Sequence, residues 1–267
     1  MAPPLAGKEP AVRESPEGPV RTKASPYITL DKALAENHIR IAKISSAASE
    51  GEDVHCELLH IARDDPLTRY RALSYAWGPA VGRRLGQIYI GDAPYPVARS
   101  LGMALRRLRP KKGPNGRPLL IWIDALCINQ ENPEEKAEQV SKMRFIYQQA
   151  LEISIWLGPG DWSPQSHLAW RLIKYLIKCP RDVDALANIV HPSRENDFDA
   201  LRLFFRRDYF WRTWVVQEVT CVKEAMAYYG SDAVPWSGLL EVCDKLSDAR
   251  GLLRRFSKEY GLNSFFY

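Results

Sequence analysis

The sequence predicts an α/β protein in which a mainly parallel sheet of about four or five strands is flanked by helices and carries peripheral β-hairpins. From residue 27 onward, short apolar runs alternate with amphipathic stretches, which is typical of strands joined by helices. Residues 119–123 are all apolar and 153–157 nearly so, which indicates strands buried on both faces. A strongly marked helix start lies between them, so these segments predict a βαβ unit.

Composition divides the chain into three predicted parts. Residues 1–26 are rich in Pro, Gly, Glu and Lys and contain no aromatic residue, so they cannot offset the entropy lost on ordering. We therefore expect a disordered N-terminal tail at 1–26, the main domain at 27–240 and a C-terminal helical extension at 241–267.

The first elements are expected to be strands. Residues 39–43 and 54–61 predict a peripheral hairpin, and residues 70–77 predict the first core strand, which ends at Gly78-Pro79. A second hairpin is predicted over residues 87–97, where Gly91-Asp92 supplies the turn. This second hairpin is expected to decorate the sheet.

Helix signals bracket the strand at 119–123. Ser100 is the predicted N-cap of a helix whose buried face carries four apolar residues: Leu101, Ala104, Leu105 and Leu108. Asn132 is the predicted N-cap of the next helix, with Pro133 at its first position and Glu135 completing a capping-box-like pattern. One side of that helix is predicted to consist of Ala137, Val140, Met143, Tyr147 and Ala150.

The last third of the domain is predicted to be mostly helical. Residues 160–196 predict a tryptophan-containing helix and a polar connection, and residues 199–220 predict one helix broken near Asp208. A last strand is predicted at 225–229 and ends at Gly230.

Charge and composition exclude several classes of protein. The 37 Lys and Arg exceed the 32 Asp and Glu by 5, a mild excess that requires no nucleic-acid partner. Five widely spaced cysteines form no C-x-x-C pair, so neither a disulfide framework nor a zinc site is indicated. No apolar run approaches the roughly 18 residues of a membrane span, and the N-terminus lacks the apolar core of a signal peptide. We expect a cytoplasmic protein without membrane or metal.

The familiar cofactor motifs are missing. The first predicted strand is not followed by G-x-G-x-x-G, and the sequence contains neither G-x-x-x-x-G-K-[ST] nor G-x-S-x-G. A Rossmann cofactor site, a P-loop and a nucleophile elbow are therefore not supported, and no bound cofactor is expected.

Glu218 is the main physical anomaly of the sequence. At about 100° per residue it falls in the middle of an apolar helix stripe that consists of Trp211, Trp214, Val215, Val219 and Val222. Burying an ionised carboxylate without a partner costs several kcal/mol, so Glu218 must be paired, protonated or open to a cleft. The alternatives are a structural ion pair with Arg206, Arg207 or Arg212, and a ligand-handling role.

Further polar residues follow the predicted parallel strands, where ligands bind in such sheets. They are Ser74, Tyr75, Trp77, Asp124, Cys127 and Asn129. Asp124 could hold a ribose hydroxyl or merely start the following turn, and Asn129 could form a turn. Cys127 has no histidine in a recognisable signature and is interpreted as a buried structural thiol.

A basic cluster lies at the end of the helix that follows the second hairpin. It consists of Arg106, Arg107, Arg109, Lys111 and Lys112. These side chains could contact phosphates, but a charged outer helix face is the commoner explanation.

Four motifs follow one another along the chain: YRALSYAWG (70–78), LLIWIDALCINQ (119–130), EQVSKMRFIYQQALEISIWLG (138–158) and FFRRDYFWRTWVVQEV (204–219). In this order they resemble the motifs of the fungal heterokaryon-incompatibility (HET) domain family. The resemblance covers about 190 residues and implies a role in fungal nonself recognition and programmed cell death. The chain departs from it at Arg99-Ser100-Leu101, where the family usually has Asn before Leu. It also ends soon after the last motif, so we expect a stand-alone domain or a truncated form.

A remoter resemblance links the chain to TIR domains, which implies a flavodoxin/TIR-like sheet. Trp214 and Glu218 match the spacing of the TIR Trp-Cys-x-x-Glu helix, without its cysteine. The likeness implies NAD as a possible substrate and Glu218 as the catalytic residue. The ligand-binding residues are then expected to be Ser74, Tyr75, Trp77, Asp124, Asn129, Arg212 and Trp214.

Two functional hypotheses follow for this chain. One is a death effector that cleaves NAD, and the other is a non-enzymatic adaptor that acts by self-association or through an incompatibility partner protein. A nucleic-acid-binding role is the least favoured, because it needs the basic residues at 106–112 and 206–207 to converge.

Overall fold

A computed structural model describes most of the predicted domain. The described residues are 27, 38–62, 65, 68–78, 85–114, 116–160, 164–180, 195–212, 218 and 224–248. The predicted tail at 1–26, Trp214 and the part of the predicted extension beyond residue 248 lie outside the described residues.

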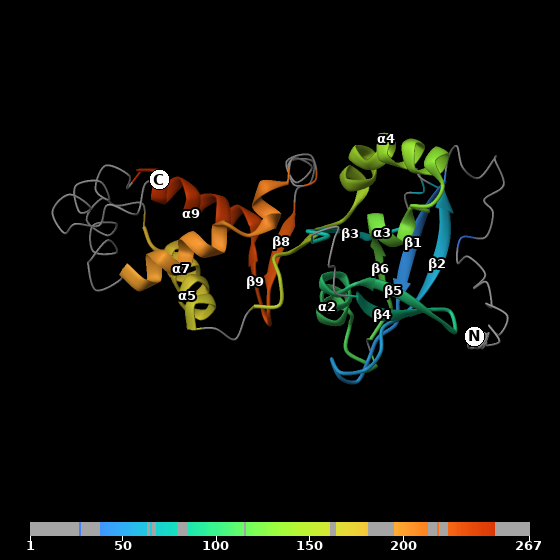
Figure 1. Ribbon diagram of the computed structural model, residues 1–267, viewed down its shortest axis with the longest axis horizontal. Helices are drawn as coiled ribbons and strands as arrows, with labels where there is room; N and C mark the ends of the chain where they lie inside the picture. Colours follow the sequence, from blue (N-terminus) through green and yellow to red (C-terminus); the bar gives the residue numbers. More distant parts are fainter. Residues whose placement is uncertain are drawn as a thin grey trace, which may run out of the picture.

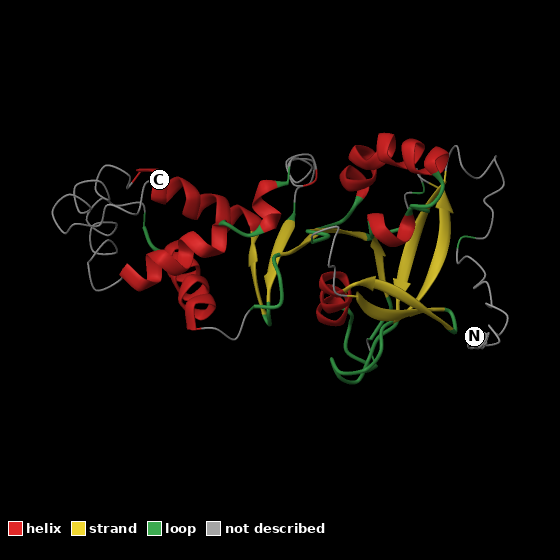
Figure 2. Cartoon of the chain, viewed as in Figure 1, coloured by secondary structure: helices red, strands yellow, loops and turns green. Residues whose placement is uncertain are grey.

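The structure is built around one mixed sheet of nine strands in the order β5-β4-β2-β1-β6-β3-β7-β8-β9, with helices around it (Figures 1 and 2). Four neighbouring pairs are parallel and four are antiparallel. The α/β class is therefore confirmed, whereas a mainly parallel sheet of four or five strands is wrong for the sheet as a whole. The strands are β1 His38–Ile44, β2 His55–Ala62, β3 Arg71–Tyr75, β4 Leu85–Ile90, β5 Ala93–Ala98, β6 Leu119–Trp122, β7 Ile153–Trp156, β8 Ala225–Tyr229 and β9 Asp232–Pro235.

Four neighbouring strands, β6-β3-β7-β8, form a continuous parallel section of the sheet. In the chain β3 comes first, β6 is added on one side of it, and β7 and β8 follow on the other side. The chain thus changes direction between β3 and β7, and such a switch point opens a crevice at the carboxyl ends of the strands. Every residue of β7 is buried, as expected for a strand covered on both faces.

Both predicted hairpins are present, but the first is not peripheral. β1 pairs with β2 in an antiparallel hairpin and also pairs with β6, so it extends the sheet from the parallel section. The strand predicted at 39–43 is confirmed, and burial of residues 39–42 shows that both faces are covered over this part. β4 and β5 form the second hairpin at the edge of the sheet, and Gly91 in its turn has a φ of +59°, which glycine adopts without strain.

Helix α2 (Arg99–Leu108) confirms the predicted apolar face but not the predicted cap. All four predicted apolar residues are buried. The N-cap is Ala98 rather than Ser100, and no side chain caps the helix. Ser100 lies inside the first turn because β5 continues directly into the helix.

Helices α3 (Asp124–Cys127) and α4 (Pro133–Gln149) follow β6. The predicted cap of α4 is confirmed, because the Asn132 side chain accepts hydrogen bonds from the N–H groups of Glu134 and Glu135. The Glu135 carboxylate does not close a capping box. It accepts the N–H of Asn129 at 2.8 Å and a bidentate pair of bonds from Arg40.

The buried face of α4 agrees in part with the predicted one. Tyr147 and the C-cap Ala150 are buried and Met143 packs against the core as predicted, whereas Ala137 is exposed. Gln139 and Ile146 are buried although the prediction did not include them. Tyr147 has a defined role there, since its hydroxyl donates to the Leu73 carbonyl of β3 at 3.2 Å.

The remaining helices gather beyond β8 and β9 at one end of the elongated molecule (Figure 1). They are α5 Pro164–Lys178, α7 Glu195–Phe205, the short 3-10 helix η2 Asp208–Trp211 and α9 Trp236–Asp248. The break predicted near Asp208 is where α7 gives way to η2. Strand β9 was not predicted, and α9 runs across the predicted boundary at residue 240. Within the described part of the chain, no helix combines the length and apolar character needed to cross a membrane.

Candidate functional site

Glu218 lies deep in the molecule, at the carboxyl end of the parallel section. It is 2% exposed, and its carboxylate accepts a short hydrogen bond from the Ser74 hydroxyl of β3. The Tyr209 hydroxyl of η2 lies 2.8 Å from the same Ser74 oxygen. An ionised Glu218 can only accept, so in that state Ser74 donates to it and Tyr209 donates to Ser74. The three side chains form a chain of hydrogen bonds from Tyr209 through Ser74 to Glu218.

The environment of Glu218 favours its neutral form. Burial raises the pKa of the carboxyl, while the Ser74 hydrogen bond and the Arg212 guanidinium act in the opposite direction. The net pKa is raised. Glu218 is therefore a carboxyl whose protonation state depends on a small number of neighbours, which is a common property of functional groups.

A second carboxylate, Asp124, lies close enough to interact with Glu218. Burial raises the pKa of Asp124 to about 6, against the effect of hydrogen bonds from Trp77 and from the Ala125 N–H. The Trp77 indole N–H donates to one carboxylate oxygen at 2.8 Å, and the Ala125 N–H donates to the other at 2.7 Å. The charge of Glu218 raises this pKa further, and Arg212 lowers it.

The register of the strands explains why these residues meet. β3 and β6 are parallel neighbours in which Ala72 lies beside Trp122. Two residues further along each strand come Ser74 and Asp124, on the same edge of the sheet. The segment that follows α7 then brings Tyr209, Arg212 and Glu218 onto this edge. Five predicted site residues are thereby brought together: Ser74, Trp77, Asp124, Arg212 and Glu218.

The other predicted site residues are placed elsewhere or are not described. Tyr75 is buried, but the alternation of side chains along β3 directs it to the opposite face from Ser74. Asn129 acts as a turn former: its side chain accepts the Glu131 N–H, and its own N–H donates to Glu135. Trp214 lies outside the described residues.

The apolar stripe that singled out Glu218 is wrong at its first member. Trp211 is 77% exposed, because it ends the 3-10 helix η2 rather than lying on the same helix face as Glu218. The inference that Glu218 is buried was nevertheless correct. Sequence reasoning missed Tyr209, although the predicted break at Asp208 was a signal that the next residue turns into the domain.

A pocket of about 300 Å³ opens at the switch point, beside this cluster. It is lined by residues that follow β3 and β7 and by part of η2: Ala76, Gly78, Ser100, Trp156, Leu157, Gly158, Arg207, Asp208 and Tyr209. Tyr209 therefore separates the pocket from Ser74 and Glu218. The volume is at the lower end of the range for small-molecule sites.

Cys127 is confirmed as buried, and its chemistry is that of a structural thiol. Burial raises its pKa to about 12, so the thiolate is not the form present near neutral pH. Its sulfur accepts the Ile123 N–H at 3.3 Å, which ties α3 to the end of β6.

The basic cluster is neither a simple charged outer face nor one patch. Arg109 is buried and donates to backbone carbonyls of residues 49–53, to which Arg106 also donates. Arg107 is directed elsewhere: its Nε donates to the Gly230 carbonyl at 3.0 Å and its Nη2 to the Ser231 carbonyl at 2.7 Å. These arginines hold two loops against α2, so the expectation of a solvated face was wrong for them, whereas Lys111 and Lys112 are exposed as expected.

The fold and the site together define an α/β domain in which buried Glu218 and half-buried Asp124 lie at the edge of its parallel strands. A family model described as Heterokaryon incompatibility protein (HET) matches residues 70–218, which is more than half of the chain and includes the whole cluster. The chain therefore belongs to the HET family.

One curated relative matches over a longer region. The chain is similar to "Heterokaryon incompatibility protein 6, OR allele" of Neurospora crassa, with 31% identity over 221 residues. The match covers 68% of this chain and 31% of the relative, so the chain spans about a third of that protein's length. No solved structure matches the chain significantly.

Proposed function

We propose that the protein acts in fungal heterokaryon incompatibility, in the cytoplasm, as an effector of programmed cell death. Membership of the HET family and the name of the Neurospora crassa relative support this role. An incompatibility partner protein or a second copy of the chain is the proposed trigger.

The proposed chemical activity is cleavage of NAD at its nicotinamide bond. The observation that carries it is the convergence of Glu218, Asp124 and Arg212 at the carboxyl ends of β3 and β6, where ligands bind in parallel sheets. Breaking an N-glycosidic bond creates positive charge on the ribose, and a carboxylate in a dry site stabilises that charge strongly. Glu218 is the proposed stabilising carboxylate, and Asp124 is the proposed ligand of a ribose hydroxyl. The order of the four parallel strands also supports the TIR-like interpretation.

The proposal requires that Glu218 become accessible. The carboxylate is 2% exposed, and Tyr209 stands between it and the pocket at the switch point. A displacement of Tyr209 breaks one hydrogen bond to Ser74 and opens the pocket toward Glu218. Such a change, coupled to self-association, would keep the free protein inactive.

A non-enzymatic adaptor is the second candidate, and the same burial favours it. Glu218 does not line the described pocket, which is what a structural carboxylate would show. Exposed apolar residues such as Trp211 and Leu203 offer surface for association.

Nicotinamide release from NAD by the concentrated, folded protein tests these alternatives. We expect release by the wild type, none by Glu218→Gln, and unchanged release by Glu131→Gln, which alters an exposed glutamate in the loop before α4. Equal release by wild type and Glu218→Gln would exclude Glu218 from catalysis. Absence of release from protein shown to be self-associated would support the adaptor.

A further inference from the structure

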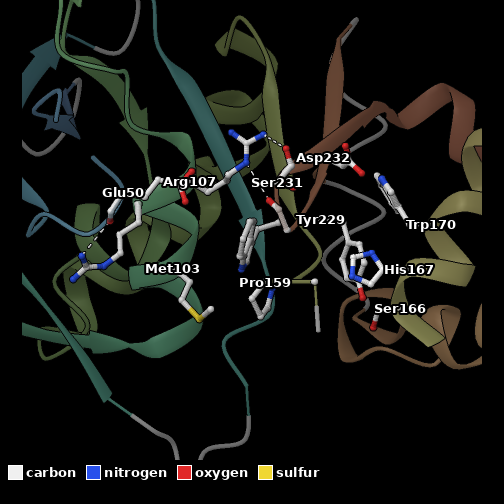
Figure 3. Close-up of a pocket in the computed structure, with 14 residues that line it drawn as sticks. Glu50, Met103, Arg107, Pro159, Ser166, His167, Trp170, Tyr229, Ser231 and Asp232 are labelled. Carbon is white, nitrogen blue, oxygen red and sulfur yellow. Dashed lines mark hydrogen bonds between the residues drawn. The ribbon is translucent and has the colours of Figure 1, made fainter. Parts of the chain in front are cut away.

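A second, larger cavity of about 350 Å³ lies beside the switch-point pocket (Figure 3). It is bounded by the last turns of α2, the ends of β7 and β8, and the first turns of α5. Its residues are Glu50, Met103, Arg106, Arg107, Trp156, Pro159, Gly160, Ser166, His167, Trp170, Tyr229, Gly230, Ser231 and Asp232. None of the residues of the Glu218 cluster lines this cavity, and residues 229–232 of its lining lie beyond the family match, which ends at residue 218.

The two cavities are neighbours that share one side chain and one helix face. Trp156, the last residue of β7, lines both. On α2, Ser100 lines the smaller cavity, whereas Met103 and Arg107 line the larger. These positions follow the i, i+3, i+7 spacing of a single helix face and extend over about 10 Å along its axis.

A hydrogen bond joins the two cavities on the opposite side. Arg207 lines the smaller cavity and Tyr229 lines the larger, and the Arg207 guanidinium donates to the Tyr229 hydroxyl at 2.7 Å. Trp156 and this pair therefore lie where the two cavities adjoin, and the two adjoining cavities together are called the groove below.

Backbone rather than side chains forms part of the groove's floor. Gly160 and Gly230 both have positive φ, and their chains approach so closely that a Cβ on Gly230 would lie 2.9 Å from the Pro159 carbonyl oxygen. The absence of side chains here leaves space above the two loops. Arg107 holds the second loop in place through the Gly230 and Ser231 carbonyls.

Positive and negative side chains occupy different parts of the groove: the arginines lie inside it and the carboxylates lie at its rim. Three arginines are half-buried in its lining: Arg106, Arg107 and Arg207. The three carboxylates in the lining, Glu50, Asp208 and Asp232, are exposed, and Asp232 is paired with Lys174 at 2.9 Å. Arg107 uses its Nε and Nη2 on carbonyls, so its Nη1 remains for a ligand, with no partner among the described residues. Half-buried guanidinium groups between aromatic walls suit an anionic ligand that carries flat rings.

We propose that this groove binds a dinucleotide in an extended form, with one nucleoside in each compartment and the pyrophosphate beside Trp156 and the flanking arginines. The inference rests on the proposed function for its orientation: the reacting end lies in the smaller compartment next to Tyr209. The other nucleoside lies in the larger compartment against Trp170 and Tyr229, with Met103 on the helix side.

Binding can be measured separately from turnover. The probes are NAD and AMP, titrated by calorimetry into Glu218→Gln protein so that NAD is not consumed. We expect NAD to bind once per chain and AMP to compete with it. In the same Glu218→Gln background, Met103→Trp fills the larger compartment. We expect it to lower the affinity for both ligands at least tenfold. Lys136→Trp, at an exposed position of α4 that lines neither cavity, is the control and should leave both affinities unchanged.

A second variant covers the case in which Met103→Trp does not fold. Arg107→Gln removes the cationic group and is expected to weaken NAD about tenfold and to reduce the salt dependence of its binding. Unchanged NAD affinity in both variants, or simultaneous binding of NAD and AMP, would overturn the proposal that the groove binds a dinucleotide. If the wild type releases no nicotinamide but the variants still weaken NAD, the hydrolase proposal fails and the groove stands. If Glu218→Gln abolishes release while Met103→Trp and Arg107→Gln, each made in the otherwise wild-type protein, leave the KM for NAD unchanged, the hydrolase stands and the groove fails.

Discussion

Two glutamates of this protein, Glu135, which is half-buried, and Glu218, which is buried, lie near arginines, and their surroundings differ. Glu135, at the start of α4, accepts two hydrogen bonds from Arg40, at 2.7 and 3.1 Å, and a third from the Asn129 N–H. Glu218 accepts a hydrogen bond from Ser74, and Arg212 acts on it electrostatically. The first carboxylate is a well-paired anion, whereas burial raises the pKa of the second.

The difference indicates what each region is for. The Arg40 side chain is 2% exposed and also donates to the Cys127 carbonyl, so its pair with Glu135 joins β1, α3 and α4 into one unit. Good geometry and full pairing are what a buried ion pair needs to be tolerated. Around Glu218, two carboxyl groups share one half-buried arginine, and neither is as fully compensated. The fold supplies Glu135 with hydrogen-bond and charge partners but leaves Glu218 incompletely paired. Incomplete pairing of a buried carboxyl group is typical of a ligand-binding site.

Breaking the Arg40–Glu135 pair is the largest effect we expect. Arg40→Met leaves the Glu135 carboxylate without its cation, and removal of one member of a buried pair costs about 3 to 5 kcal/mol. The measurement is the free energy of unfolding from urea denaturation at pH 7.5.

The matched control for this variant is a double substitution. Arg40→Met with Glu135→Gln removes the unpaired charge and should recover at least half of the loss, since Gln still accepts the Asn129 N–H. An equal loss in the single and double variants would show that packing of the Arg40 stem, rather than charge, is what matters.

The second expected effect is a pH dependence that originates in Asp124. Its pKa is raised from 3.8 to about 6, so the folded protein binds a proton more tightly than the unfolded chain between these values. The contribution to stability is therefore fully present below pH 4 and is lost as the pH rises through 6, by about 3 kcal/mol. Unfolding free energies of wild type and Asp124→Asn should be compared from pH 4 to pH 8.

In the Asp124→Asn variant only one side-chain oxygen remains to accept the two hydrogen bonds from Trp77 and Ala125. The loss of stability from this missing hydrogen bond does not change with pH. The difference between the two proteins should therefore shift in favour of the variant as the pH rises. A constant difference across this range would show that Asp124 does not titrate with a raised pKa.

Sequence patterns predicted the local elements and part of the site for physical reasons. The strand before Asp124 was recognisable because strands buried on both faces are continuously apolar, and parallel strands present their ends at one edge. That rule alone was enough to bring Ser74 and Asp124 together. The rule does not say which way a side chain faces, and Tyr75 was included although it lies on the other face.

Contacts between distant segments were beyond sequence reasoning. Arg40 lies in a hairpin that was expected to be peripheral, so its pairing with Glu135, 95 residues later, had no local signal. Tyr209 was missed because its place depends on how tightly the chain turns after α7. The same turn exposes Trp211, which a continuous helix would have buried.

Tyr209→Phe isolates the hydrogen-bond chain at a smaller scale. Losing the hydroxyl removes the donor to Ser74 at 2.8 Å while the ring remains packed, and we expect a loss of about 1 kcal/mol in unfolding free energy. Tyr147→Phe is the comparison, because it removes another buried hydroxyl, one that bonds to the Leu73 carbonyl instead. If the hydrogen-bond chain tunes Glu218, only Tyr209→Phe should change the pH profile of nicotinamide release. The same pH profile of nicotinamide release in both variants would show that the Tyr209 hydroxyl does not influence the ionisation of Glu218.

Glu218→Gln gives the sharpest contrast with Arg40→Met, because the expected change in stability is smallest and can have the opposite sign. A carboxyl with a raised pKa loses stability as the pH rises above that pKa, so an uncharged amide should be tolerated at least as well. We expect the unfolding free energy at pH 7.5 to be unchanged or higher than that of the wild type, and the advantage to disappear as the pH falls and the wild-type carboxyl becomes protonated. Urea denaturation of both proteins over a series of pH values from 4 to 8 checks this. A loss of several kcal/mol at pH 7.5 would place Glu218 in the same class as Glu135, as an ionised partner that the fold requires. Retained stability with lost activity would mean that the carboxylate is maintained for chemistry at the expense of stability.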